Sequence, residues 1–302
     1  MGIFVTMPLS GLMCVYGFAG GWPSIFYLLG TAGIIFTVIW YFTAFDSPHV
    51  HPRISREEFV YIRSSMEENV EKRTRKEVAI PWIPMITSIP VWAIFIGHFC
   101  GDFGAYMMMT NLPLFMNDVL GFDQARMGLF AGIPYLLYAV VINLGGIAAD
   151  KLRKSETLST TGVRRLAMIL GLGSQAVFLV ACAYCQCGQE NLVVTFLTLG
   201  IGLSGVQFAG YCVNYIDVAP HFAGTLVGIG NMLGGVAGII CPLLVGWLVK
   251  EGTREEWKIV FWITGVVLIL GAMIFSIFCD GKVQSWARIE KAENKETSEN
   301  LV

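Results

Sequence analysis

The hydrophobic positions of this chain form long runs separated by polar stretches, and these runs set its architecture. Nearly all are long enough for a helix to cross a hydrocarbon core of ~30 Å. The first run contains Pro8 and Gly11 and is interpreted as part of a span. The pattern predicts an all-α membrane protein with eight transmembrane helices, at residues 1–16, 22–44, 90–116, 126–149, 163–183, 192–213, 222–249 and 257–279.

One long polar segment, residues 46–88, interrupts the hydrophobic runs. Ser55 followed by two glutamates is typical of a helix start, and Phe59, Ile62 and Met66 recur at helical spacing. We expect one amphipathic helix here, lying on the membrane surface or against the helix bundle. Mixed charge of this kind is more typical of a solvated face than of a ligand site.

Composition and charge agree with a membrane protein. Hydrophobic residues make up 55% of the chain and charged residues 14%, a depletion of charge that excludes an ordinary soluble domain. Of the 20 Lys and Arg, seven lie in the 46–88 linker, five in the 150–165 loop and four after Asp280. Because cytosolic loops carry the excess of positive charge, the linker, this loop and the C-terminus are predicted to be cytosolic.

A compact motif ends the 126–149 run, where Gly146 precedes Asp150 by four residues and basic residues follow. The glycine lets a neighbouring helix come close. Asp150 is placed to hold Lys151 and Arg153, and we expect these three residues to act in conformational gating. The alternative is a helix end whose basic side chains reach the interface. This order of small, acidic and basic residues resembles the loop signature of the major facilitator superfamily.

Five motifs in order along the chain carry a more specific resemblance. They are Asp46-Ser-Pro-x-x-His51-Pro-Arg-Ile-Ser55, Leu158-Ser-Thr-Thr-x-x-Arg164-Arg165, Asn214-Tyr-Ile-Asp217-Val-Ala-Pro220, Gly228-Ile-Gly-Asn231 and Gln284-Ser-Trp286-Ala. They resemble the anion/cation symporter family, which contains sialin, the sodium/phosphate cotransporters and the vesicular glutamate transporters. The resemblance implies the major facilitator fold, with two six-helix halves, substrate bound between them and rocker-switch alternating access.

The first recognisable span corresponds to the fifth of twelve in that family, so the resemblance implies that the first four spans are lacking. An isoform, a degenerate gene product and an incomplete gene model all stay open, and we favour the last. The implied domains are the last two spans of the N-terminal half at 1–45, the central linker at 46–88, the complete C-terminal half at 89–281 and a cytosolic tail at 282–302.

The resemblance also implies a function. We expect a secondary active transporter of a small organic or inorganic anion, coupled to protons or sodium, in the bilayer of the plasma membrane or of a lysosome or vesicle. The alternative is a truncated, non-transporting membrane protein that acts through partners. No Ser/His/Asp set or phosphate loop is evident, and Cys182, Cys185 and Cys187 lack His or acidic partners, so we expect no enzyme, metal, cofactor or nucleic acid.

The side chains that contact the substrate are expected to be polar but uncharged. Every Lys and Arg lies in a loop or at a span end, so we expect no buried cation for a carboxylate. Gly101 stands where vesicular glutamate members have an arginine, which puts glutamate specificity in doubt. Asn231 is the first candidate because an amide both donates and accepts hydrogen bonds; an interhelical amide bond is its alternative role. Tyr106 and Gln207 are weaker candidates.

Asp102 lies within the 90–116 run, where a central carboxylate costs ~3 kcal/mol on insertion scales. We therefore expect it to face the cavity or to carry a proton. His98 lies one turn earlier on the same face and can share that proton. We hypothesise that Asp102 and His98 form a proton or sodium coupling site; the alternatives are an acid in a wet vestibule or one paired with an absent span.

Helix contacts can be predicted as well. The 222–249 run carries glycines at small-xxx-small spacing, which we expect to form a tight contact with a neighbouring helix. They are Gly224, Gly228, Gly230, Gly234 and Gly238. We expect Asp217 and Pro220 to cap and start the helix of this run.

Overall fold

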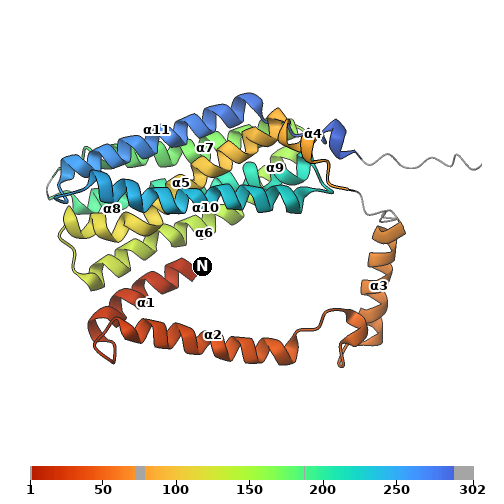
Figure 1. Ribbon diagram of the computed structural model, residues 1–302, viewed down its shortest axis with the longest axis horizontal. Coiled ribbons are helices and arrows are strands. Elements are labelled where there is room, and N and C mark those ends of the chain that lie inside the picture. Colours follow the sequence, from red (N-terminus) through yellow and green to blue (C-terminus); the bar gives the residue numbers. More distant parts are fainter. Residues whose placement is uncertain (1, 72–78, 187, 289–302) are drawn as a thin grey trace, which may run out of the picture. The chain divides into compact units, whose positions relative to one another are not determined.

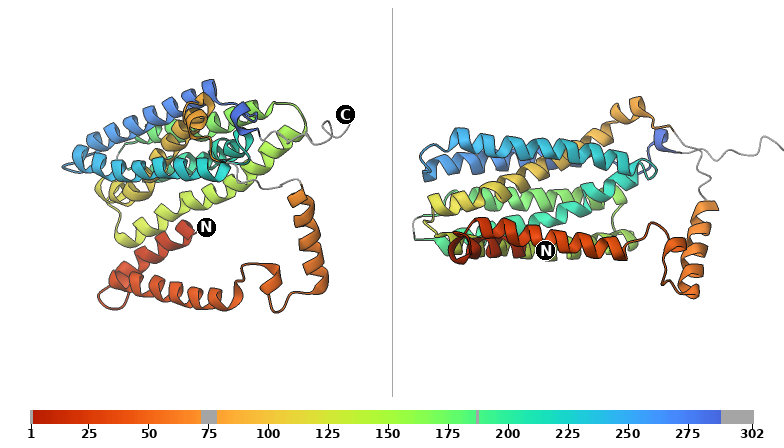
Figure 2. Two further views of the ribbon diagram at one scale, coloured as in Figure 1. Left: turned by 45° about the vertical axis from the view of Figure 1, so that its right-hand side comes forward. Right: turned by 60° about the horizontal axis from the view of Figure 1, so that its bottom comes forward.

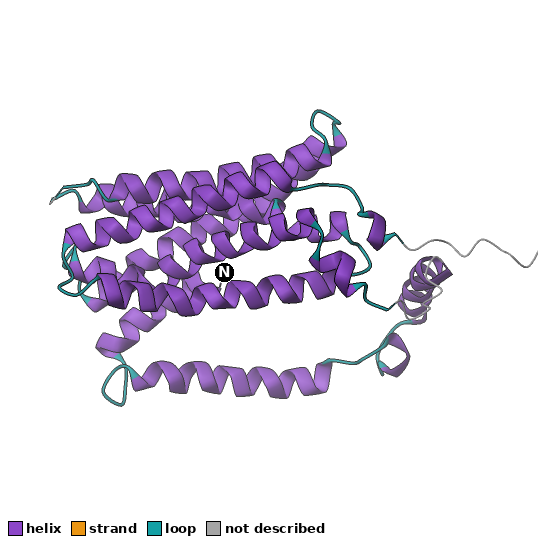
Figure 3. Ribbon diagram, turned by 45° about the horizontal axis from the view of Figure 1, so that its top comes forward, coloured by secondary structure: helices purple, strands orange, loops and turns teal. Residues whose placement is uncertain are grey.

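The computed structural model describes residues 2–71, 79–186 and 188–288, and this part of the chain is helical without a strand (Figures 1 and 3). The α-helices are α1 (Gly2–Tyr16), α2 (Pro23–Thr43), α3 (Arg56–Glu71), α4 (Trp82–Ile86), α5 (Ile89–Asp118), α6 (Gln124–Lys154), α7 (Thr160–Cys182), α8 (Glu190–Ser204), α9 (Tyr211–Val218), α10 (Ala223–Leu248) and α11 (Arg254–Phe278). Short 3₁₀ segments are η1 (Pro48–Val50), η2 (Gly205–Ala209) and η3 (Ser285–Ala287).

Each predicted span coincides with a helix, and the all-α prediction is confirmed. Six helical stretches within the described residues are long and apolar enough to cross a membrane: α2, α6, α7, the α8–α9 stretch, α10 and α11. The other two predicted spans are α1, which has 15 residues, and α5, which has 30. α5 is long enough to span but is not among these six, and it carries the polar residues His98, Asp102 and Asn111.

The chain divides into two compact units. One unit, Tyr16–Ile80, contains α2, η1 and α3. Its predicted amphipathic helix begins where the sequence indicated, because the Ser55 hydroxyl accepts a hydrogen bond from the backbone N–H of Glu58 at 3.1 Å. Before this helix, the rings of Phe45 and His51 lie 4.7 Å apart.

The other unit, Met1–Val15 with Pro81–Val302, is a helical bundle organised around α5 (Figure 2). Helices α10 and α11 pack on α5, α7 packs on α11 and α8, and α6 packs on α8 and η2. α5 buries side chains around its whole circumference, as expected of a central helix. They include Val91, Ile94, Met107, Met108 and Leu112.

Helix α1 also belongs to this bundle, and it meets α6 through small residues. A Cβ atom built on Gly11 would lie 2.8 Å from the Cα of Gly128. One turn away, a Cβ on Gly132 would lie 2.9 Å from the Pro8 ring. Glycine at these positions therefore lets the two helix backbones touch, as in other small-residue contacts between transmembrane helices.

The α8–α9 span is interrupted by the 3₁₀ segment η2. A 3₁₀ stretch inside a longer helix changes the hydrogen-bond pattern and often marks a hinge. η2 packs closely on α7, because a Cβ on Gly171 would lie 2.7 Å from the backbone nitrogen of Gln207. The interruption redirects α9 toward α5, which it contacts beside His98.

Candidate functional site

His98 and Asp102 lie one turn apart on α5 in the middle of the bundle. His98 Nε2 is 3.3 Å from Asp102 Oδ2, so the proximity expected from their spacing is observed. The two side chains differ in accessibility: His98 is 5% exposed and Asp102 is 24% exposed. The Asp102 carboxylate is therefore partly accessible, while its partner is fixed inside the protein.

Two tyrosines of α9 hold the imidazole. His98 Nδ1 lies 3.0 Å from the Tyr215 hydroxyl, and the Tyr211 ring stacks on the imidazole at a centroid distance of 4.3 Å. When the Tyr215 hydroxyl donates to Nδ1, Nε2 carries the proton and donates to Asp102. Sequence reasoning missed both tyrosines, although Tyr215 stands inside the Asn214–Pro220 motif.

The opposite wall of this cluster is the glycine face of α10. A Cβ on Gly234 would overlap the Asp102 carboxylate, and a Cβ on Gly230 would lie 2.7 Å from His98 Nδ1. One turn further, a Cβ on Gly238 would lie 3.5 Å from the Tyr106 ring. The predicted tight contact is thus confirmed for Gly230 and Gly234, while Gly238 makes an ordinary van der Waals contact.

Gly224 and Gly228 are different. A Cβ built on either would meet nothing within 4 Å, so the expectation of a tight contact is wrong for these two positions. The reason is helix geometry: Gly224 and Gly228 lie on a different face of α10 from Gly230, Gly234 and Gly238.

The remaining substrate candidates are scattered. Tyr106 continues the face of His98 and Asp102 on α5. Asn231 is exposed on α10 and makes no hydrogen bond within the described part of the chain. Gln207 is buried instead against Gly101, and its Oε1 has no partner among the residues described. The structure therefore groups Tyr106 with the His98–Asp102 pair and leaves Asn231 and Gln207 apart.

The three gating candidates lie at the end of α6. Arg153 Nη2 is 3.8 Å from Asp150 Oδ1, and both side chains are largely exposed. Lys151 forms no ion pair with any residue that the structure describes. Asp150 thus holds one of the two expected partners, through a contact of the kind that contributes little when exposed.

A stronger ion pair, not foreseen in the sequence, lies at the start of α7. Arg164 Nε donates to Asp217 Oδ2 at 2.7 Å, Nη2 lies 3.4 Å from Oδ1, and Nη1 donates to the Ala209 carbonyl at 2.8 Å. This corrects two expectations. A cation is buried after all, although at a span end, and Asp217 does not cap α10, whose N-cap is Phe222.

This ion pair is part of a larger network at one end of the bundle. Asn214 Nδ2 donates to the Asp280 carbonyl at 2.8 Å, and the Gln284 N–H donates to the Val218 carbonyl at 2.9 Å. The Gly281 N–H donates to the Thr161 hydroxyl at 2.9 Å. Three of the five motifs, distant in sequence, therefore meet in space.

The bundle of apolar helices with a polar cluster inside it defines an integral, multi-pass membrane protein. Comparison with known proteins is more specific: the Major Facilitator Superfamily model matches residues 1–163 and 155–300. The chain belongs to this superfamily.

Individual relatives agree with this assignment. The chain is 47% identical over 296 residues to the uncharacterized transporter slc-17.2 of Caenorhabditis elegans, covering 98% of this chain and 60% of that protein. It is 36% identical over 295 residues to vesicular glutamate transporter 1 of Xenopus tropicalis, covering 97% and 50%. For vesicular glutamate transporter 3 of Danio rerio, identity is 37% over 296 residues, covering 97% and 49%.

These relatives confirm the resemblance to the anion/cation symporter family. The chain spans about half to three fifths of the length of the curated relatives described above. All three relatives are transporters by name, and this does not favour the alternative of a non-transporting protein.

Proposed function

We propose that this chain forms the C-terminal half, and the end of the N-terminal half, of a sialin-like secondary active carrier of organic or inorganic anions. Membership of the superfamily supports transport by rocker-switch alternating access, with substrate between two helical halves. The names of the vesicular glutamate transporters support an organic anion as substrate and a vesicular membrane as location. The linker and the C-terminus face the cytosol in this proposal, on the strength of the Lys and Arg distribution.

The observation that carries the proposal is the His98–Asp102 pair. The Asp102 carboxylate is 24% exposed within a helix bundle, and its imidazole partner is held by Tyr215. We assign the coupling of transport to this pair, with a proton in preference to sodium. An imidazole accepts a proton near neutral pH, whereas hard cations prefer several oxygen ligands.

The substrate contacts follow from accessibility. Asn231 offers an exposed amide on α10, and Tyr106 offers a half-buried hydroxyl one turn beyond Asp102. We propose that both donate hydrogen bonds to the anion. Gln207 is a weaker contact, because its buried amide lies against Gly101 and would have to move toward the cavity.

Gating is assigned to the inner end of α6. In this proposal Asp150 holds Arg153 in one conformation of the cycle and releases it in the other, with Lys151 as the alternate partner. An exposed pair suits this role, because a contact worth ~0.2–1 kcal/mol can be broken without unfolding the helix end.

The experiment uses a chimera in which the first four spans of slc-17.2 precede this chain. Proteoliposomes are loaded to give either a pH gradient or a sodium gradient, and uptake of labelled anions is measured. We expect Asp102→Asn to abolish accumulation driven by the pH gradient while leaving anion exchange intact. An unchanged dependence on both gradients would refute the coupling site.

A control variant makes this test specific. Glu255→Gln removes a carboxylate from the exposed start of α11, where it pairs with Lys258 at 3.6 Å. It should keep the dependence on pH. Loss of sodium-driven uptake in Asp102→Asn, with pH dependence retained, would place sodium at the site in place of the proton.

A further inference from the structure

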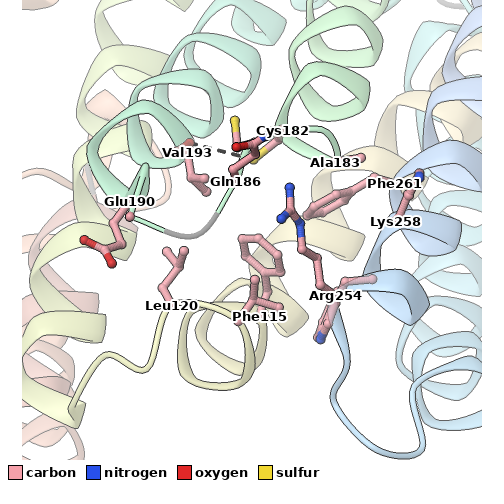
Figure 4. Close-up of a pocket in the computed structure, with 14 residues that line it drawn as sticks. Phe115, Leu120, Cys182, Ala183, Gln186, Glu190, Val193, Arg254, Lys258 and Phe261 are labelled. Atoms are coloured by element: carbon pink, nitrogen blue, oxygen red, sulfur yellow. Dashed lines mark hydrogen bonds between the residues drawn. The ribbon is translucent and has the colours of Figure 1, made fainter.

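A small cavity lies at the end of the bundle that the charge distribution predicts to be non-cytosolic (Figure 4). Its volume is about 90 Å³, and it lies between the end of α5, the loop after α7 and the first turns of α11. Phe115 and Phe261 form an apolar wall, and Cys182, Cys185 and Arg254 add reactive and charged groups. None of these three residues takes part in the proposed transport mechanism.

The two thiols lie within one tight turn. Cys182 is the last residue of α7, and the backbone N–H of Cys185 donates to the Cys182 carbonyl at 3.3 Å. Such a turn brings its first and fourth Cα atoms within 7 Å, close to the range that a disulfide spans. Each Sγ makes one weak contact at 3.8 Å, to the carbonyl of Val193 or of Ala181, so neither thiol is locked in place.

Arg254 extends into the same space (Figure 4), and it forms no ion pair or hydrogen bond with any described residue. Glu190 also lines the cavity, whereas two other carboxylates near the start of α11 are already engaged. Glu256 accepts hydrogen bonds from backbone N–H groups of the loop before α11, and Asp118 accepts one from the Trp257 indole at 3.2 Å. The guanidinium charge therefore acts on the thiols. Burial raises the pKa of the Cys185 thiol, and Arg254 opposes that rise.

We propose that Cys182 and Cys185 form a redox-active pair that reacts with small disulfides of the glutathione type and closes into an intramolecular disulfide. The Cys185 thiolate attacks one sulfur of the small disulfide, and the departing thiolate takes up the proton that Cys185 lost. The Cys182 thiolate then attacks the Cys185 sulfur of the mixed disulfide, and a second thiol molecule leaves. Two protein thiols and one disulfide thus yield one protein disulfide and two small thiols.

Two features of the cavity fit this chemistry. The guanidinium favours the attacking thiolate and attracts the carboxylates that glutathione disulfide carries. The compartment fits as well, because disulfides persist on the non-cytosolic side of membranes. Cys182 and Cys185 are 4% and 7% exposed, and both line the cavity. Cys241 is buried elsewhere, between α10 and α5, with its thiol donating to the Phe103 carbonyl at 3.4 Å.

The test uses the full 302-residue protein in detergent, with Cys187→Ser as background because Cys187 lies outside the described residues. The protein is incubated with glutathione disulfide without oxygen, quenched with a maleimide and measured by intact mass. We expect two thiols to become unreactive with no glutathione attached. A stable glutathione adduct, or full labelling of both thiols, would overturn the proposal.

Single variants assign the steps. In Cys182→Ser the resolving thiol is missing, so one glutathione should stay attached to Cys185. Cys241→Ser is the matched control, and it should lose the same two reactive thiols as the background protein. In Arg254→Gln the reaction should slow by about threefold, because the thiolate fraction falls. A rate equal to that of the background protein would show that Arg254 does not assist the reaction.

Discussion

Two carboxylates of the bundle pair with a buried nitrogen group, and they differ in how completely they are paired. At one end of the bundle, Asp217 and Arg164 meet through two contacts, and their side chains are 11% and 3% exposed. In the centre, Asp102 meets His98 through one contact of 3.3 Å and is 24% exposed. Both carboxylate oxygens of Asp217 contact Arg164. Asp102 instead keeps a partly accessible carboxylate, and its partner His98 can lose its charge.

This difference fits a structural role for Asp217 and the coupling role that we propose for Asp102. A buried Arg–carboxylate pair cannot change its charge state, because arginine does not lose its proton and a protonated Asp217 would leave a buried cation. The His98–Asp102 pair has no such constraint, since either partner can carry the proton. Asp217, the better paired acid, is thus less suited than Asp102 to the proposed proton coupling.

The largest effect expected is that of Asp217→Asn. It leaves the buried guanidinium of Arg164 without a counter-charge, and we expect it to destabilise the protein by about 3 kcal/mol. Urea or thermal unfolding in detergent measures the loss. A double variant, Arg164→Met with Asp217→Leu, should recover most of it. If Asp217→Asn unfolds like the parent protein, the ion pair does not stabilise the bundle.

Gly234→Ala should cause the second largest loss of stability. The new Cβ would overlap the Asp102 carboxylate, so either this side chain must turn away from His98 or α5 and α10 must separate, at a cost of ~1–3 kcal/mol. Gly235→Ala is the matched control, because a Cβ there meets nothing within 4 Å. Alanine should stabilise this neighbouring position by up to ~1 kcal/mol through helix propensity. Equal stability of the two variants would contradict the close contact.

Asp102→Asn should change stability by less than ~1 kcal/mol, because the amide can still accept a hydrogen bond from His98 and is easier to bury than a charge. The same unfolding experiment checks this. A loss of stability as large as that of Asp217→Asn would show that both acids are structural, which would contradict the different roles assigned to the two pairs.

The smallest effect belongs to Asp150→Asn. Its contact with Arg153 is exposed and 3.8 Å long, so we expect a loss of ~0.3 kcal/mol or less. In the chimera with slc-17.2, transport should slow more than the amount of protein at the membrane falls. Equal losses of rate and amount would leave Asp150 with a purely structural role.

Much of this architecture could be predicted from sequence, because apolar runs and helix-start signals are local. The start of α3 at Ser55 and the pairing of His98 with Asp102 depend on residues within one turn of each other. The pairing of Arg164 with Asp217 depends on how α7 packs against η2 and α9, which no local pattern records. The same holds for Tyr215, whose role depends on the turn that η2 makes before α9.

The separation of Arg164 and Asp217 along the chain also bears on how the protein is made. The two residues are 53 positions apart, and Arg164 is synthesised first. At ~5–20 residues per second, ribosomes leave Arg164 without its partner for about 3–10 s. During that interval the arginine would be costly inside the bilayer, so α7 must keep its first turn at the aqueous surface until α9 arrives. The first turn of α7 can therefore take its final position only after α9 has supplied Asp217 as the counter-charge of Arg164.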